Sequence, residues 1–81
     1  MYHENHKIND VILTIINDGN GETCGMTYQE RKAAVKNHDL PAIRRAVEKY
    51  GKKYYGENFK QEYIFIAGDF IFDYYEKEML E

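Results

Sequence analysis

Residues 62–81, EYIFIAGDFIFDYYEKEMLE, set the first limit on the fold, because apolar and aromatic side chains dominate this segment. Residues 63–66 and 70–72 flank an Ala-Gly-Asp triplet and could form the two arms of a β-hairpin on residue preference alone. That hairpin would be apolar on both faces. A chain of 81 residues has little with which to cover two faces.

A single helix explains the polar positions of the same segment better. They fall near one edge of a 3.6-residue wheel and comprise Glu62, Asp69, Asp73, Glu76 and Lys77. We therefore predict one long helix from about residue 59 to 79, and the hairpin is kept as the alternative. Asn58 with Gln61 resembles an N-terminal cap, and Gly68 inside the helix predicts close packing.

The N-terminal part of the chain predicts a β-hairpin. Residues 11–16, VILTII, are rich in β-branched side chains, which favour a strand. The next five residues, 17–21, carry the Gly, Asn and Asp side chains of a tight turn. Residues 22–25 would return as a second, short strand, and residues 1–7 are expected to fray.

Two short helices are predicted in the centre of the chain. Thr27 and Glu30 have the spacing of a capping box, which predicts a helix from residue 28 to about 37 or 38. Asp39 is the expected cap of the next helix, with Gly51 at its C-terminal end. One apolar stripe follows that helix and consists of Leu40, Ile43, Val47 and Tyr50. The predicted fold is therefore a single α+β domain spanning residues 1–81, in which an N-terminal β-hairpin packs with two short helices and a long C-terminal helix.

The composition predicts the compartment of the protein and the distribution of its charge. A single cysteine cannot form an internal disulfide, and no stretch of about eighteen apolar residues is present. We therefore expect a cytoplasmic protein without a membrane span. The net charge of −3 hides a strong segregation, with net −4 over residues 1–30, +6 over 31–53 and −5 over 57–81. Segregated charge can steer partners of opposite sign, unless the segments neutralise each other in the fold.

Motifs for catalysis and metal binding are weak. Asp18, Asn20 and Glu22 carry side-chain oxygens at alternate positions, as do the first ligands of a calcium-binding loop. The rest of the motif does not match, because Thr23 and Gln29 occupy the positions at which that loop has Gly and Glu. The possible zinc ligands Cys24, His3, His6 and His38 lack the paired spacings of a zinc site. The chain has no serine, and Cys24 has no neighbouring base. We expect neither an enzyme nor a cofactor.

The acidic and tyrosine-rich C-terminal segment indicates a protein interface. Tyrosine supplies a large contact area with few rotors, and carboxylates select a basic partner. The predicted partner-binding residues are Asp69, Asp73, Tyr74, Glu76 and Glu78. In size, acidity, single-domain build and the EYIFIAGDFIFDYYEKEMLE segment, the chain resembles small accessory proteins of phages and mobile elements, among them the anti-CRISPR proteins. That resemblance implies an inhibitor that binds a basic surface of a Cas effector and blocks the entry of nucleic acid.

Two other functions stay open at this point. The second central helix is rich in arginine and lysine, which can bind phosphate, and it is followed by Tyr54 and Tyr55, whose rings can stack on nucleobases. This combination indicates a small nucleic-acid-binding regulator. Its predicted contacts are Arg44, Arg45, Lys49 and Lys53. The other function is an oligomeric structural protein, which would be found as a stable homodimer without a bound ligand.

Overall fold

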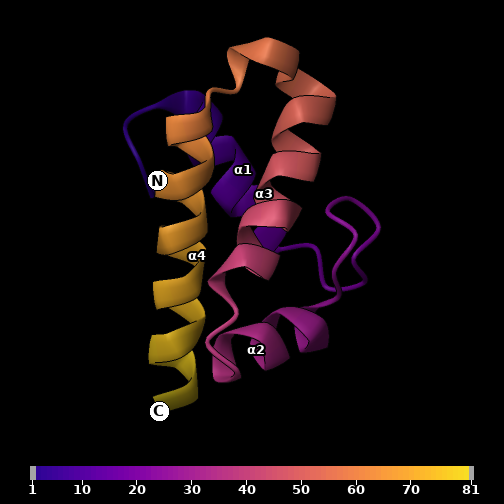
Figure 1. Cartoon of the computed structure of the whole chain (residues 1–81), viewed down its shortest axis with the longest axis vertical. Coiled ribbons are helices and arrows are strands. Elements are labelled where there is room, and N and C mark those ends of the chain that lie inside the picture. The colour runs from indigo at the N-terminus through magenta and orange to yellow at the C-terminus, as the bar shows by residue number, and fades with distance from the viewer. Residues whose placement is uncertain (1, 81) are drawn as a thin grey trace.

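A computed structural model describes residues 2–80, and this part of the chain is all-helical (Figure 1). Its elements are α1 (His6–Ile16), α2 (Tyr28–Lys36), α3 (Leu40–Tyr55), the 3₁₀ turn η1 (Gly56–Asn58) and α4 (Gln61–Leu80). No strand occurs within these residues, so the predicted α+β class and N-terminal β-hairpin are wrong. Figure 1 shows α3 and α4 running side by side, with α1 behind them and α2 across one end.

The segment predicted as the first strand belongs to α1. Asn5 caps this helix, and its side chain accepts hydrogen bonds from the backbone N–H groups of Lys7 and Ile8. The buried side chains recur at helical spacing and are Ile8, Val11, Ile12 and Ile15, each at most 1% exposed. Burial of this complete stripe outweighs the modest preference of β-branched residues for strands. Tyr2 packs on Phe70 of α4, with ring centroids 5.2 Å apart.

Residues 17–27 form an irregular loop, which replaces the predicted turn and second strand. Asp18 organises it by accepting hydrogen bonds of 3.0 Å from the backbone N–H groups of Thr23 and Cys24. Gly21 and Gly25 have φ values of 72° and 81°, a region that glycine enters without strain. The glycines therefore mark a folded loop between two helices, not a hairpin turn.

The local signals of the two central helices are confirmed. Thr27 and Glu30 form the capping box of α2, and the Asp39 side chain accepts from the N–H of Ala42 at the start of α3. The predicted end of α3 at Gly51 is wrong, because the helix continues to Tyr55 and Gly56 is its C-cap. Gly51 is buried, and a Cβ atom there would meet the Phe59 ring at 2.6 Å from Cε2 and 2.7 Å from Cγ.

The long C-terminal helix is confirmed as α4, and the alternative hairpin is wrong. It begins at Gln61, and Asn58 lies in η1 instead of capping it. Gly68 is buried against α3, where an added Cβ would lie 2.9 Å from Cγ of Arg44. The predicted close packing at this glycine is therefore confirmed. None of the helices within residues 2–80 combines the length and apolarity needed to cross a membrane.

The two helical glycines should respond differently to alanine. In Gly51→Ala the new methyl group meets a buried ring that has no room to move, so overpacking exceeds the gain in helix propensity. We expect a loss of about 1–2 kcal/mol in the free energy of unfolding. In Gly68→Ala the neighbour is the partly exposed Arg44 side chain, which can shift, and we expect a change within about 0.5 kcal/mol. Urea denaturation followed by circular dichroism measures both, and equal losses would contradict the assignment.

Candidate functional site

The surface of α4 is divided by its packing. Its buried residues share one side of the helix and contact α1 and α3; they are Ile64, Ala67, Gly68, Ile71 and Tyr75. Most of the acidic side chains lie on the remaining surface. This division follows from the 3.6-residue period, which repeats the buried positions every three or four residues.

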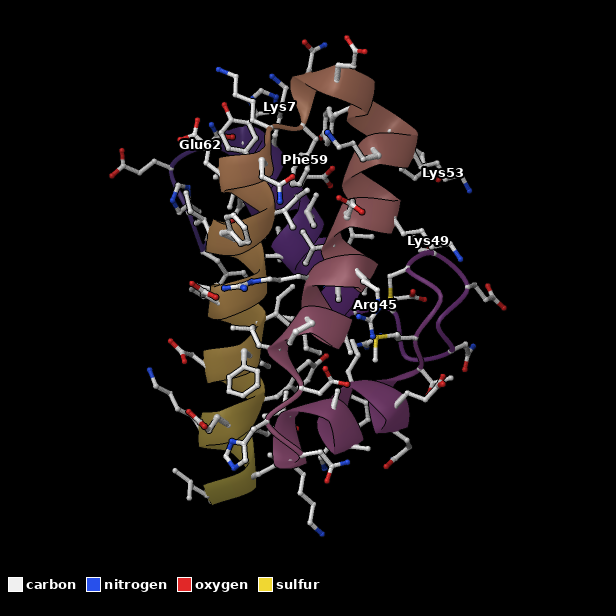
Figure 2. The ribbon with its side chains drawn as sticks, in the orientation of Figure 1. Lys7, Arg45, Lys49, Lys53, Phe59 and Glu62 are labelled. Atoms are coloured by element: carbon white, nitrogen blue, oxygen red, sulfur yellow. The ribbon has the colours of Figure 1, made fainter. Side chains whose placement is uncertain are left out.

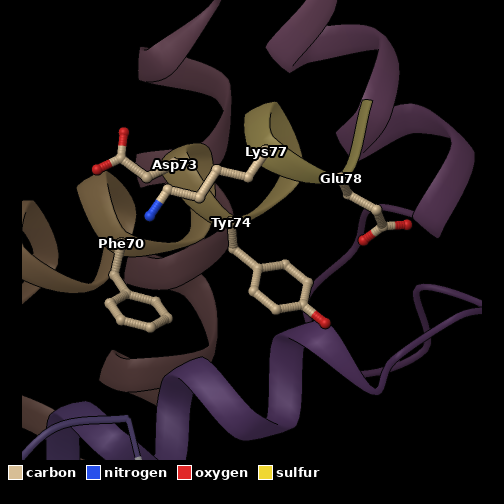
Figure 3. A pocket seen from close by; sticks show the side chains of 5 residues that line it. All are labelled: Phe70, Asp73, Tyr74, Lys77 and Glu78. Carbon is tan, nitrogen blue, oxygen red and sulfur yellow. The ribbon is translucent and has the colours of Figure 1, made fainter. Parts of the chain in front are cut away.

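A groove on α4 gathers aromatic and charged side chains (Figure 3). It has a volume of about 360 Å³ and is lined by Phe70, Asp73, Tyr74, Lys77 and Glu78. We call it the α4 groove. Figure 3 shows the rings of Phe70 and Tyr74 on the same side of the helix, with the carboxylates of Asp73 and Glu78 at either end.

Contacts from the rest of the chain hold the α4 groove in place. The ring of Tyr2 lies 5.2 Å from that of Phe70 and 6.2 Å from that of Tyr74, measured between centroids. The Tyr28 hydroxyl donates a hydrogen bond to Glu78, and this bond raises the pKa of Tyr28 above its usual value of 10. Both rings and one carboxylate are therefore oriented before any ligand arrives.

The chemistry of the α4 groove suits a cation. Aromatic faces attract guanidinium and ammonium groups, and carboxylates form charge-assisted hydrogen bonds with them. One lysine, Lys77, also lines the groove and reaches along it in Figure 3. This side chain is exposed, and a cation from outside can occupy the whole groove only if Lys77 moves.

The structure brings together three of the five predicted partner-binding residues. Asp73, Tyr74 and Glu78 line the α4 groove. Asp69 lies outside it, because its carboxylate pairs with Nη2 of Arg44 at 3.0 Å. Glu76 is half-buried and does not line the groove.

The four predicted nucleic-acid contacts divide between two sides of α3. Arg44 turns toward α4, where it pairs with Asp69 and lies over the Phe65 ring at 4.5 Å. Arg45, Lys49 and Lys53 are exposed, and Figure 2 shows Lys49 and Lys53 pointing away from α4. The Arg44–Asp69 pair is the one ion pair within residues 2–80, so the basic and acidic segments neutralise each other through a single direct contact.

The thiol and the histidines belong to no group of three possible metal ligands among the described residues. Burial raises the pKa of the Cys24 thiol, and its Sγ donates to the Met26 carbonyl at 3.3 Å. No group of three His, Cys, Asp or Glu side chains converges anywhere in residues 2–80. Partial burial favours a higher pKa for Asp18, but hydrogen bonds from Cys24 and Thr23 and the nearby Arg31 hold it below 3.8. That carboxylate is thus used to fold the loop.

Three residues of the candidate site were missed by sequence reasoning. Phe70 and Lys77 line the α4 groove, and Tyr2 packs against it. The helical spacing offered a signal for two of them, since Phe70 lies four residues before Tyr74 and Lys77 four after Asp73. Tyr2 gave no such signal, because its contact joins residues far apart in the sequence.

Comparison with known proteins identifies no relative of this chain. Searches with protein-family models, among curated proteins and among solved structures find no match to this chain.

Proposed function

We propose that this chain is a non-enzymatic protein-binding module, an inhibitor or regulator, that engages a basic surface of its partner through the α4 groove. The observation that carries this proposal is that Asp73 and Glu78 line the same groove as the rings of Phe70 and Tyr74. An arginine or lysine of the partner can stack on the rings and donate to the carboxylates. The aromatic rings attract a cationic side chain in addition to the carboxylates. The groove should therefore bind the side chain of an arginine or lysine more strongly than it binds a small hydrated cation from the buffer.

The partner class follows from the same chemistry. Proteins that bind nucleic acid expose arginine and lysine side chains to hold phosphates. A module that occupies those side chains competes with the nucleic acid. In line with the resemblance to anti-CRISPR proteins, we propose a Cas effector as the partner.

The alternative of a nucleic-acid-binding regulator is less well supported. It needs Arg44, Arg45, Lys49 and Lys53 on a common surface, and Arg44 instead pairs with Asp69 on the side that faces α4. Tight, strongly salt-dependent binding of bare DNA or RNA in a mobility-shift assay would favour this alternative and contradict the protein-binding proposal as stated.

A short peptide containing four arginines tests the α4 groove directly. We expect it to bind the chain in a calorimetric titration, and we expect the same peptide with citrulline at these positions to bind at least about tenfold more weakly, because citrulline has no charge. The variant Asp73→Asn with Glu78→Gln should lose at least about tenfold in affinity for the arginine peptide.

The matched control is Asp69→Asn combined with Glu62→Gln. It removes the same two charges from exposed positions of α4 outside the groove. We expect this control to keep the affinity within about threefold, since screened surface charge contributes little. Equal losses in the two double variants would show attraction to net charge alone and would overturn the assignment of the groove.

A further inference from the structure

A second hollow lies on another side of the molecule, between the loop before α2 and the exposed side of α3. Its volume is about 270 Å³, and we call it the loop pocket. It is lined by Cys24, Gly25, Met26, Ala42, Arg45, Ala46 and Lys49. No acidic side chain lines it, in a protein whose net charge is −3.

Two cations face the loop pocket from one side of α3. Arg45 and Lys49 are one helical turn apart, and neither makes a hydrogen bond or ion pair with another side chain in residues 2–80. Lys49 reaches over the loop so closely that a Cβ atom at Gly25 would lie 2.8 Å from its Nζ. The glycine therefore leaves the space that the ammonium group uses, and the alanines at 42 and 46 keep the hollow open between the cations.

A third positive charge lies behind the wall of the loop pocket. Arg31 is completely buried, and its Nη1 donates to the Met26 carbonyl and lies 3.5 Å from Sγ of Cys24. Both of these residues line the pocket. Within residues 2–80, Nη2 of Arg31 has no acceptor, and no carboxylate of these residues lies within 4.0 Å of the guanidinium.

Asp18 partly balances this charge, because its carboxylate interacts electrostatically with Arg31. The same carboxylate accepts hydrogen bonds from the N–H groups of Thr23 and Cys24. The positive potential of the loop pocket therefore rests on its two lining cations, Arg45 and Lys49.

We propose that the loop pocket binds a phosphate-type oxyanion, as the terminal phosphate of a small phosphorylated ligand carries. The planar guanidinium of Arg45 matches two phosphate oxygens, and the ammonium of Lys49 neutralises the remaining charge. This site is separate from the α4 groove, and it stands or falls independently of the proposed function.

Inorganic phosphate is the probe for this site. The full chain is titrated at constant ionic strength while ¹H–¹⁵N spectra are recorded. We expect saturable shifts centred on the amides of Gly25, Arg45 and Lys49. The variant Arg45→Gln with Lys49→Gln should bind phosphate at least about tenfold more weakly, because two charge-assisted interactions are lost. Unchanged thermal unfolding of the variant verifies that these exposed substitutions leave the fold intact.

The control variant is Lys53→Gln. Lys53 lies on α3 one turn beyond Lys49, is exposed, and does not line the loop pocket. The affinity of the Lys53→Gln variant for phosphate should stay within about twofold of the affinity of the parent chain. Shifts that grow linearly without saturation, or an equal loss in the control, would overturn the proposal.

An oligonucleotide distinguishes the two sources of phosphate. The probe is single-stranded and carries no terminal phosphate. Its binding should be weaker than that of inorganic phosphate if the pocket accepts a terminal phosphate group. The proposal is overturned if phosphate does not bind saturably and the oligonucleotide does bind, with an affinity that depends on Lys53 as strongly as on Lys49. That result would identify an extended nucleic-acid-binding surface.

Discussion

Replacing Arg31 with alanine should lower the free energy of unfolding by about 3–5 kcal/mol, a large share of the about 4–12 kcal/mol available to a domain of this size. Arg31 is 0% exposed, and its Nε donates to the Tyr75 hydroxyl at 2.9 Å. Its Nη1 donates to the Met26 carbonyl. The truncation leaves a cavity, takes the donor from the buried Tyr75 hydroxyl and leaves the Met26 carbonyl with only the Cys24 thiol as donor, and each of these effects destabilises the folded state. Denaturation in urea, followed by circular dichroism, measures the loss.

Arg31→Met separates the volume of the side chain from its charge. Methionine fills most of the space, and it removes the penalty for burying a guanidinium that has no carboxylate of residues 2–80 within 4.0 Å. This relief offsets much of the loss of the hydrogen bonds, so we expect Arg31→Met to stay within about 2 kcal/mol of the parent. A loss below about 1 kcal/mol for Arg31→Ala, or equal losses for both variants, would contradict this account.

The structural elements that were predicted correctly rest on short-range signals. The capping box of Thr27 and Glu30 lies within one turn of helix, as does the Asp39 cap. The long α4 was predicted because a two-faced apolar hairpin would lack cover, and the four-helix arrangement now shows that α1 and α3 cover one side of it. These arguments needed no knowledge of distant contacts.

The N-terminal error shows where residue preference fails. Residues 11–16 were interpreted as a strand because this run, taken alone, shows no helical spacing. The buried stripe of α1 begins upstream of it, at Ile8. With Ile8 included, the spacing is helical, and Asn5 supplies the cap. The preference of valine and isoleucine for strands is small compared with the burial of four complete side chains.

Gly51 and Arg31 were misread for a different reason. Gly51 was interpreted as a helix end, but its missing side chain makes room for Phe59, which returns to it after η1. Arg31 was counted in the basic central segment, but it is buried against Tyr75, 44 residues away. Both contacts are specified by tertiary packing, and no local sequence pattern predicts them.

The candidate site was predicted in part for similar reasons. Asp73, Tyr74 and Glu78 were named because acid and tyrosine cluster in the sequence, and they do line the α4 groove. The division of Arg44 from Arg45 was not predicted, because adjacent residues on a helix point about 100° apart and only the position of α4 decides which one it meets.

Phe59→Ala should destabilise the fold by about 3–5 kcal/mol, as much as the loss of Arg31. Phe59 is 0% exposed and lies between α3 and α4 (Figure 2). Its ring stacks on Tyr55 at 6.1 Å, meets Tyr63 edge-on at 5.6 Å and contacts Gly51. Alanine would leave a cavity where the chain turns from one helix to the next. Urea denaturation is again the measurement.

Phe65→Ala is the matched control, because it removes the same ring from an exposed position of α4. Phe65 is 43% exposed and has Arg44 over its face, so we expect its loss to cost less than about 1 kcal/mol. A loss of similar size in both variants would contradict the role of Phe59. Because Phe59 fixes where α4 begins against α3, its replacement should also weaken binding of the arginine peptide to the α4 groove, whereas Phe65→Ala should leave that affinity within about threefold.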